Sequence, residues 1–170
     1  MSRLDVVIGD TMTTLTITAD SDSPRSAESW DNFVIPCGVL DLGQRHIVSN
    51  PPLPEELTNA IGEMMDHIDD AKRELPAVLD ATDVFLAGVV PRVMAAVELG
   101  RAIEAEEFVL AREAAEDVFR TLATESTADR RHNPGLPADL VDTIVGGTCV
   151  VIGLIRGLQL DAVTVMMKQL

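Results

Sequence analysis

The side chains best suited to metal binding or nucleophilic catalysis are few and widely spaced. The chain has three histidines and two cysteines, and no two of them stand at the short spacing of a motif such as Cys-x-x-Cys. A structural zinc site takes about four imidazole or thiolate ligands. Both cysteines have apolar neighbours, which favours buried, reduced thiols in a cytoplasmic protein. We therefore predict no catalytic residue and no metal site, and assign ordinary structural roles to Cys37, Cys149, His46, His67 and His132.

An acidic cluster at Asp66, Asp69 and Asp70 is the other candidate for binding a cation. It lies off the apolar stripe of an amphipathic stretch, in which apolar residues recur at alternating spacings of four and three. The sequence has no second acidic cluster with matching geometry, which a metal site would need. We interpret the cluster as the solvated face of a helix.

Composition and charge restrict the partners of the chain. The 170 residues contain 28 acidic and 13 basic side chains, a formal net charge of −15. A field of this sign repels nucleic acid and anionic membranes, and it opposes a polyanion such as polyphosphate. The longest apolar run, residues 144–155, is shorter than the ~20 residues that span a bilayer, so it predicts a buried helix. We expect one globular cytoplasmic domain, residues 1–170, that binds neither nucleic acid nor membrane.

The spacing of apolar residues locates the elements that must position any site. Short β-branched or alternating runs predict strands at 4–8, 13–18, 30–35, 84–87 and 162–166. Helical spacing predicts helices at 39–46, 54–75, 93–99, 104–124 and 138–158. Glycines inside the last helix predict that another backbone packs closely against it. An acidic, Ser-rich stretch at 20–29 predicts an exposed loop, and Gly9 to Met12 predicts a hairpin turn.

The order of these elements predicts the fold class. Three consecutive strands imply an antiparallel meander, and strands joined through helices imply parallel additions to the same sheet. This is the ribonuclease-H-like order found in actin, hexokinase and Hsp70. We predict an α/β domain with a mixed five-stranded sheet and helices on its faces.

Four stretches of the sequence follow the pattern of a known family over almost the whole chain. They are residues 6–9, residues 35–42 with 49–57, residues 130–147, and residues 163–165. The third is the most specific, with Arg130-Arg131, Pro134-Gly135-Leu136, Asp142-Thr143-Ile144 and Gly146-Gly147 in order. On these residues the chain resembles the second domain of the exopolyphosphatase and guanosine pentaphosphate phosphatase (Ppx/GppA) family. The resemblance implies an actin/hexokinase-like phosphotransfer fold, with another domain on the N-terminal side across a cleft.

The resemblance also implies that three loops would contact phosphate, and all three are altered. The family's first loop is Gly-Gly-Gly-Ser-Thr-Glu, in which glycines let backbone N–H groups approach phosphate and the Glu is catalytic. Here residues 9–14 read Gly-Asp-Thr-Met-Thr-Thr, so a threonine replaces the Glu, and the new aspartate opposes an anion by about 1 kcal/mol or more. The second loop, Gly-Thr-Gly-Gly-Thr, has become residues 86–90, Leu-Ala-Gly-Val-Val. The last of them, Ser-x-x-Gly-Leu in the family, reads Met-Met-Lys-Gln-Leu at residues 166–170 here. The remaining candidates for phosphate binding are Gly9, Asp10, Thr11, Thr13 and Gly88.

Three functions are open at this point. The first is a catalytically impaired exopolyphosphatase-like domain that acts as an interaction or regulatory module. The second is the C-terminal half of an active polyphosphate or pppGpp phosphohydrolase, in which Mg²⁺ would assist the reaction. The third is a small-anion or nucleotide-binding domain. No cofactor is expected outside the second function, and the expected partner is a second copy of the chain or the N-terminal domain that the resemblance implies.

Overall fold

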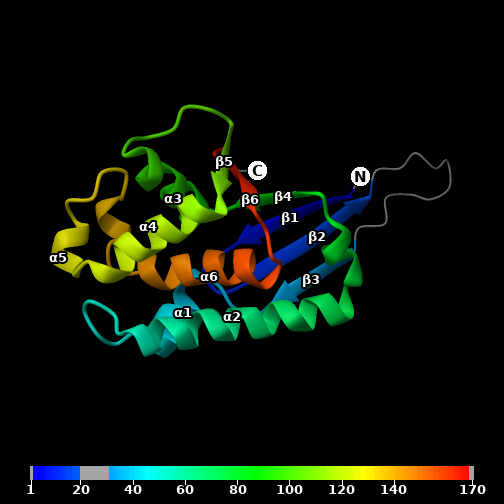
Figure 1. Ribbon diagram of the computed structural model, residues 1–170, viewed down its shortest axis with the longest axis horizontal. Helices are drawn as coiled ribbons and strands as arrows, with labels where there is room; N and C mark the ends of the chain where they lie inside the picture. The colour runs from blue at the N-terminus through cyan, green and yellow to red at the C-terminus, as the bar shows by residue number, and fades with distance from the viewer. Residues whose placement is uncertain (1, 20–30, 169–170) are drawn as a thin grey trace.

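A six-stranded mixed sheet forms one layer of the domain (Figure 1). The computed structural model describes residues 2–19 and 31–168, and the predicted loop at 20–29 lies outside the described residues. The strands lie in the order β3-β2-β1-β4-β6-β5. Their bounds are β1 Ser2–Ile8, β2 Thr13–Ala19, β3 Asp31–Ile35, β4 Asp83–Ala87, β5 Glu107–Ala111 and β6 Ala162–Met166.

The pairing of the strands confirms the predicted ribonuclease-H-like order. β1, β2 and β3 form an antiparallel meander, with Val7 opposite Thr14 and Thr14 opposite Val34. β4 then adds to β1 in parallel, and β6 adds to β4 in parallel. The carboxyl ends of β1 and β4 therefore meet at the same edge of the sheet, which is where the loops singled out by the sequence begin.

The prediction of five strands was wrong, because β5 lies within the stretch expected to form a helix over 104–124. β5 pairs antiparallel with β6 at the edge of the sheet, and α4 begins only at Arg112. The aromatic and β-branched residues Phe108 and Val109 suit a strand, but the acidic residues before them suit the first turn of a helix. The pairing with β6 decides between the two, and this is a long-range contact that local spacing does not reveal.

Two long helices and several short ones complete the domain. The predicted helices at 39–46 and 54–75 are confirmed, and the one predicted at 93–99 begins earlier, at Val89. Their bounds are α1 Val39–His46, α2 Pro54–Glu74, α3 Val89–Leu99, α4 Arg112–Thr124, α5 Thr127–Arg130 and α6 Ile144–Gly157, with short 3₁₀ helices η1 Pro76–Asp80 and η2 Ala138–Leu140.

The last helix starts later than predicted. Only η2 forms at the beginning of the expected 138–158 helix, and α6 begins at Ile144. The carbonyl of Val141 accepts a hydrogen bond from Nη1 of Arg130 at 2.8 Å, so it is paired outside a helix. None of the described helices combines the length and the apolar character that a bilayer crossing requires.

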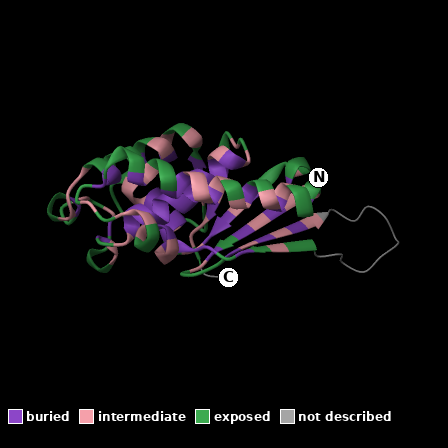
Figure 2. Cartoon of the chain, turned by 90° about the horizontal axis from the view of Figure 1, so that it is seen from below, coloured by how far each residue is buried: buried purple, intermediate pink, exposed green. Residues whose placement is uncertain are grey.

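The helix α6 forms the centre of the core, and its glycines fit the close approach that was predicted. Thirteen of its residues are buried, and Figure 2 shows the buried zone between the sheet and the outer helices. A Cβ on Gly146 would lie 2.7 Å from Cα of Gly43 in α1, and one on Gly153 would lie 2.6 Å from Cβ of Met64 in α2. The close packing of α6 is therefore satisfied within the domain.

Side chains alternate in burial along the strands, which shows that the helices cover one face of the sheet more fully than the other. Leu4, Val6 and Ile8 of β1 are buried, whereas Val7 between them is 45% exposed. On the same open face Val34 of β3 is 50% exposed and Val109 of β5 is 67% exposed. In Figure 2 the helices lie on one side of the sheet.

Candidate functional site

Three backbone segments converge at the carboxyl ends of β1 and β4. The first is the turn from Gly9 to Met12, in which the Gly9 N–H donates to the carbonyl of Met12 at 2.9 Å, as the predicted hairpin requires. The second is Gly38, which precedes α1: a Cβ there would lie 2.4 Å from the Gly9 carbonyl oxygen. The third is Gly88, where φ is +138° and a Cβ would lie 2.5 Å from the carbonyl oxygen of Ile8. Both Gly38 and Gly88 therefore allow backbone to touch backbone.

The backbone N–H groups of residues 38–40, at the start of α1, donate to oxygens of the protein. The N–H of Val39 donates to the Gly9 carbonyl and the N–H of Leu40 to the Asp10 carbonyl, both at 2.9 Å. The N–H of Gly38 donates to the carboxylate of Asp41 at 2.8 Å. An anion at the start of a helix is normally held by such free N–H groups. At α1 those groups instead fasten the β1–β2 turn to the helix.

The predicted phosphate-binding residues are brought together in part. Gly9, Asp10 and Thr11 share the turn, the side chains of the last two are exposed, and Gly88 adjoins the turn through Ile8. Thr13 points the other way, because it is fully buried and its hydroxyl donates to the carbonyl of Cys37 at 2.8 Å. The role of Thr13 visible in the structure is to tie β2 to the segment before α1.

A pocket of about 290 Å³ lies next to α1 and is lined in part by Val39 and Leu40. It is lined by residues of the stretches that resemble the Ppx/GppA family, among them Ser49, Asn50, Arg130 and Asp142. Arg130 is almost fully buried, and its Nε donates to the carbonyl of Glu125 at 3.2 Å in addition to the bond to the 141 carbonyl. Burial lowers the pKa of Arg130, and the nearby acidic groups oppose that shift.

A buried carboxylate holds the loop that forms one wall of this pocket. Glu56 accepts hydrogen bonds from the backbone N–H groups of Val48, Ser49 and Leu53 and from the Ser49 hydroxyl, at 2.9–3.4 Å. These bonds, led by the one from Leu53, lower the pKa of Glu56. The Ser-Asn-Pro-Pro and Glu-Glu-Leu stretches are thus linked by a structural contact.

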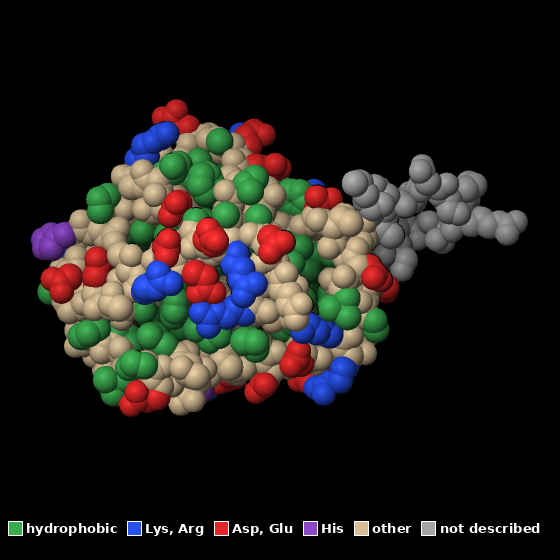
Figure 3. Space-filling view, in the orientation of Figure 1, with side chains coloured by type: hydrophobic (Ala, Val, Ile, Leu, Met, Phe, Trp, Pro, Cys, Tyr) green, Lys and Arg blue, Asp and Glu red, His purple; other side chains and the backbone are tan. Residues whose placement is uncertain are grey.

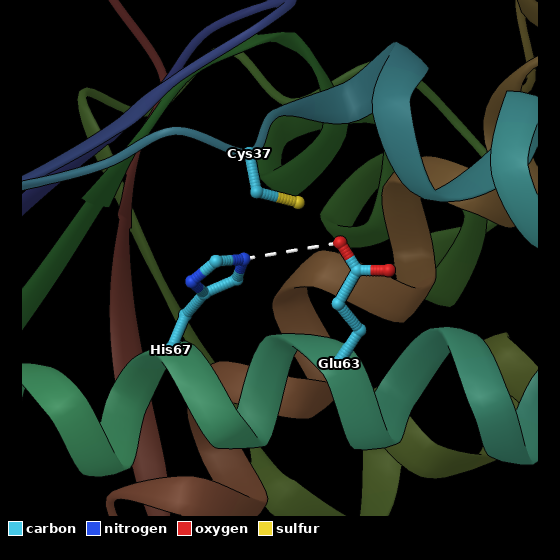
Figure 4. A group of neighbouring side chains, drawn as sticks. All are labelled: Cys37, Glu63 and His67. Carbon is cyan, nitrogen blue, oxygen red and sulfur yellow. Dashed lines mark ion pairs between the residues drawn. The ribbon is translucent and has the colours of Figure 1, made fainter.

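One cluster was missed by the sequence prediction, which treated the histidines and cysteines as isolated. Cys37, Glu63 and His67 place their Sγ, carboxylate oxygen and imidazole nitrogen within 4.8 Å of one another (Figure 4). His46 also contacts Glu63, with 2.5 Å between Nε2 and Oε2. Glu63 and His67 stand one helical turn apart, which was the only local signal; Cys37 joins them through the packing of α1 on α2.

Comparison with known proteins gives likeness in structure only. No protein-family model and no curated protein matches the sequence. Among solved structures, an exopolyphosphatase-like protein is similar with a TM-score of 0.88 and 20% identity, over 98% of this chain and 54% of its own. A Ppx/GppA family member from Aquifex aeolicus gives 0.80 and 15%, over 97% and 52%. An exopolyphosphatase from Cytophaga hutchinsonii gives 0.71 and 15%, over 96% and 52%.

The chain spans about half the length of each of these structures, so their whole activity does not transfer to it. At 14–20% identity the likeness concerns the fold, as the resemblance predicted from the sequence. The chain has the actin-like, ribonuclease-H-like fold of one half of a Ppx/GppA exopolyphosphatase structure.

Proposed function

We propose that this chain is an exopolyphosphatase-like domain that does not catalyse phosphate release and acts as an interaction or regulatory module. The observation that carries the proposal is the junction of the β1–β2 turn with α1. There the N–H groups of residues 38–40 bond to protein oxygens, and the exposed carboxylate of Asp10 occupies the turn. Binding phosphate at this point would require breaking those bonds and placing an anion beside an anion.

Surface charge supports the same proposal. The net charge is −15, and basic side chains lie beside acidic ones on the face shown in Figure 3. Pairs such as Arg120 with Asp117 and Arg156 with Glu116 neutralise basic groups that could otherwise attract a polyanion. A polyphosphate chain would meet a repulsive field on approach to this domain.

The likeness to solved exopolyphosphatases favours a second candidate, the C-terminal half of an active polyphosphate or pppGpp phosphohydrolase. In that case Asp10 would be the carboxylate of the turn available to hold Mg²⁺, since Thr14 stands where the resemblance places the catalytic Glu. A small-anion or nucleotide site is the third candidate, and Arg130 on the wall of the 290 Å³ pocket is the residue that favours it.

Phosphate release separates these candidates. The longest natural chain that contains residues 1–170 is incubated with polyphosphate and with pppGpp in the presence of Mg²⁺, beside its Asp10→Asn variant and a blank without protein. A non-catalytic module gives no release above the blank. Release by the wild-type chain that disappears in Asp10→Asn would support the hydrolase instead. A thermal shift caused by phosphate, without release, would support the anion site.

The open face of the sheet is the surface that we propose for interaction, with a second copy of the chain as the occupant. Val34, Thr14 and Val7 lie side by side in register and carry no charge, whereas Arg3 stacks at 3.8 Å over the Phe85 ring further along the face. Two molecules of charge −15 repel each other, and a contact through this uncharged row keeps acidic side chains out of direct contact. An isologous contact would place this row against itself.

Sedimentation velocity tests this dimer. We expect the wild-type chain to sediment as a dimer at micromolar concentration and the Val7→Glu/Val34→Glu variant to sediment as a monomer. Leu79→Glu is the matched control, because Leu79 is 61% exposed in η1, away from the open face. A monomeric wild-type chain at high concentration would end the dimer proposal.

A further inference from the structure

Cys37, Glu63 and His67 form a compact group of unlike ligands between two elements. Cys37 lies in the segment between β3 and α1, and Glu63 and His67 project from one face of α2, as Figure 4 shows. Nε2 of His67 lies 3.8 Å from Oε1 of Glu63, and the three ligand atoms lie within 4.8 Å of one another. Cys37 is fully buried, whereas both α2 side chains keep about a quarter of their surface exposed. The buried Cys37 thiol therefore lies on the inner side of the group, and the partly exposed Glu63 and His67 side chains leave the other side open to an ion from solvent.

The chemistry of the three groups favours one class of metal ion. A thiolate, an imidazole and a carboxylate are the ligands of Zn²⁺ in proteins, whereas Mg²⁺ and Ca²⁺ prefer oxygen alone. With metal–ligand distances of roughly 2.0–2.3 Å, the ligand atoms of a tetrahedral zinc site lie about 3.3–3.8 Å apart. The pair on α2, at 3.8 Å, is close to this separation. The three ligand atoms, which lie within 4.8 Å of one another, must draw together by about 1 Å to reach it. Three protein ligands would leave a fourth position for water or for a shifted His46.

We propose that Cys37, Glu63 and His67 bind a zinc-class divalent cation, which would tie the segment before α1 to α2. The proposal does not rest on the function proposed above, because none of the three residues lies in the β1–β2 turn. His46 contacts the second oxygen of Glu63 at 2.5 Å and so orients that carboxylate.

Arg45 is the group with which the metal must compete. Its Nη2 lies 2.6 Å from Oε1 of Glu63 and 3.6 Å from Sγ of Cys37. The guanidinium thus supplies the positive charge between the two ligands in the structure. The Arg45 side chain is 45% exposed, so it can swing into solvent when a cation binds. This competition predicts that removing Arg45 strengthens metal binding.

The experiment is a titration of the full chain, freed of metal with a chelator, with Zn²⁺ alone. Isothermal titration calorimetry and competition with a chromophoric chelator measure the affinity and the stoichiometry. We expect one Zn²⁺ per chain, no heat with Mg²⁺, and an affinity at least tenfold higher in Arg45→Gln. Loss of a ligand should weaken binding by at least the 10- to 100-fold that loss of an outer contact costs. His67→Gln tests this at a partly exposed position on the surface of α2, and Cys37→Ser tests the buried one.

Controls and refutation use residues elsewhere in the chain. Cys149→Ser and His132→Gln should leave the affinity for Zn²⁺ unchanged, because neither residue belongs to the group. Circular dichroism confirms that each variant is folded. The proposal is overturned if neither the wild-type chain nor Arg45→Gln binds Zn²⁺, or if folded His67→Gln binds it as tightly as the wild-type chain.

Discussion

Replacing Gly88 by alanine tests whether this residue is required by backbone packing. Its φ of +138° is a conformation that side-chain-bearing residues rarely adopt, at a cost of about 1–3 kcal/mol. The added Cβ would also lie 2.5 Å from the carbonyl oxygen of Ile8, which belongs to the central strand β1. Overpacking of this kind costs a further ~1–3 kcal/mol. We therefore expect Gly88→Ala to lower the free energy of unfolding by about 4 kcal/mol.

The matched control is Gly62→Ala in α2. A Cβ there meets no atom within 4 Å, and the residue lies inside a regular helix. Alanine is favoured over glycine in such a position by about 0.5–1 kcal/mol, so this variant should be slightly more stable than the wild-type chain. The same chemical change is thus predicted to have opposite signs at two positions.

Thermal and urea unfolding followed by circular dichroism measure both variants. For a chain of this size each 1 kcal/mol moves the Tm by about 2–4 °C, so Gly88→Ala should fall by roughly 8–16 °C and Gly62→Ala should rise by about 1–4 °C. A Tm of Gly88→Ala within 2 °C of the wild-type value would refute the packing argument. It would then favour a role of this glycine in contacting a ligand.

Three further predictions concern polar and thiol groups. The bonds to the loop lower the pKa of the Glu56 carboxylate. The carboxylate therefore stabilises the fold at pH values above its ordinary pKa, and this stability is lost as the pH falls through the lowered pKa. We expect the free energy of unfolding of Glu56→Gln, measured by urea titration at each pH, to depend less on pH between about 5 and 3 than that of the wild-type chain. Arg156 and Glu116 form a partly exposed bidentate pair with distances of 2.6–2.7 Å. A double-mutant cycle of Arg156→Met and Glu116→Gln should give a coupling of about 1 kcal/mol, whereas zero coupling would mean that the pair contributes nothing to stability. Burial raises the pKa of Cys37 to about 11 and that of Cys149 to about 12, so iodoacetamide at pH 8 should modify neither thiol until the chain is unfolded, as mass spectrometry would record.

Local patterns predicted most of the elements because each has its own signal. The amphipathic stripe and the acidic first turn after Pro54 mark α2, whose predicted range differs from the observed one by a single residue. The alternation in β2 and the short interval before it mark the hairpin with β1. The parallel arrangement of β1, β4 and β6 followed from the helices between them, which a parallel connection requires.

The errors arose where a distant contact overrides a local preference. β5 pairs with β6, which follows it by about fifty residues. Before α6 begins, the carbonyl of Val141 accepts a hydrogen bond from Arg130 and is not available to a helix. Neither contact leaves a trace in the spacing of nearby residues. The ligand group of Cys37, Glu63 and His67 was missed for the same reason, because its members meet only when α1 packs on α2.

The residues that match the Ppx/GppA pattern can be evidence for the fold or for catalysis, and their contacts decide between the two. Glu56 lies in one of the best-matching stretches and holds its loop by accepting hydrogen bonds from three backbone N–H groups. Arg130 lies in another and donates to two backbone carbonyls that have no partner within a helix. Both are buried charged side chains whose loss would leave several polar groups unpaired. Gly88, the one glycine shared with the second phosphate loop, is also required by packing against β1. Because folding alone explains each of these residues, their agreement with the family supports the fold and lends no weight to catalysis, which would have to come from the turn that carries Asp10.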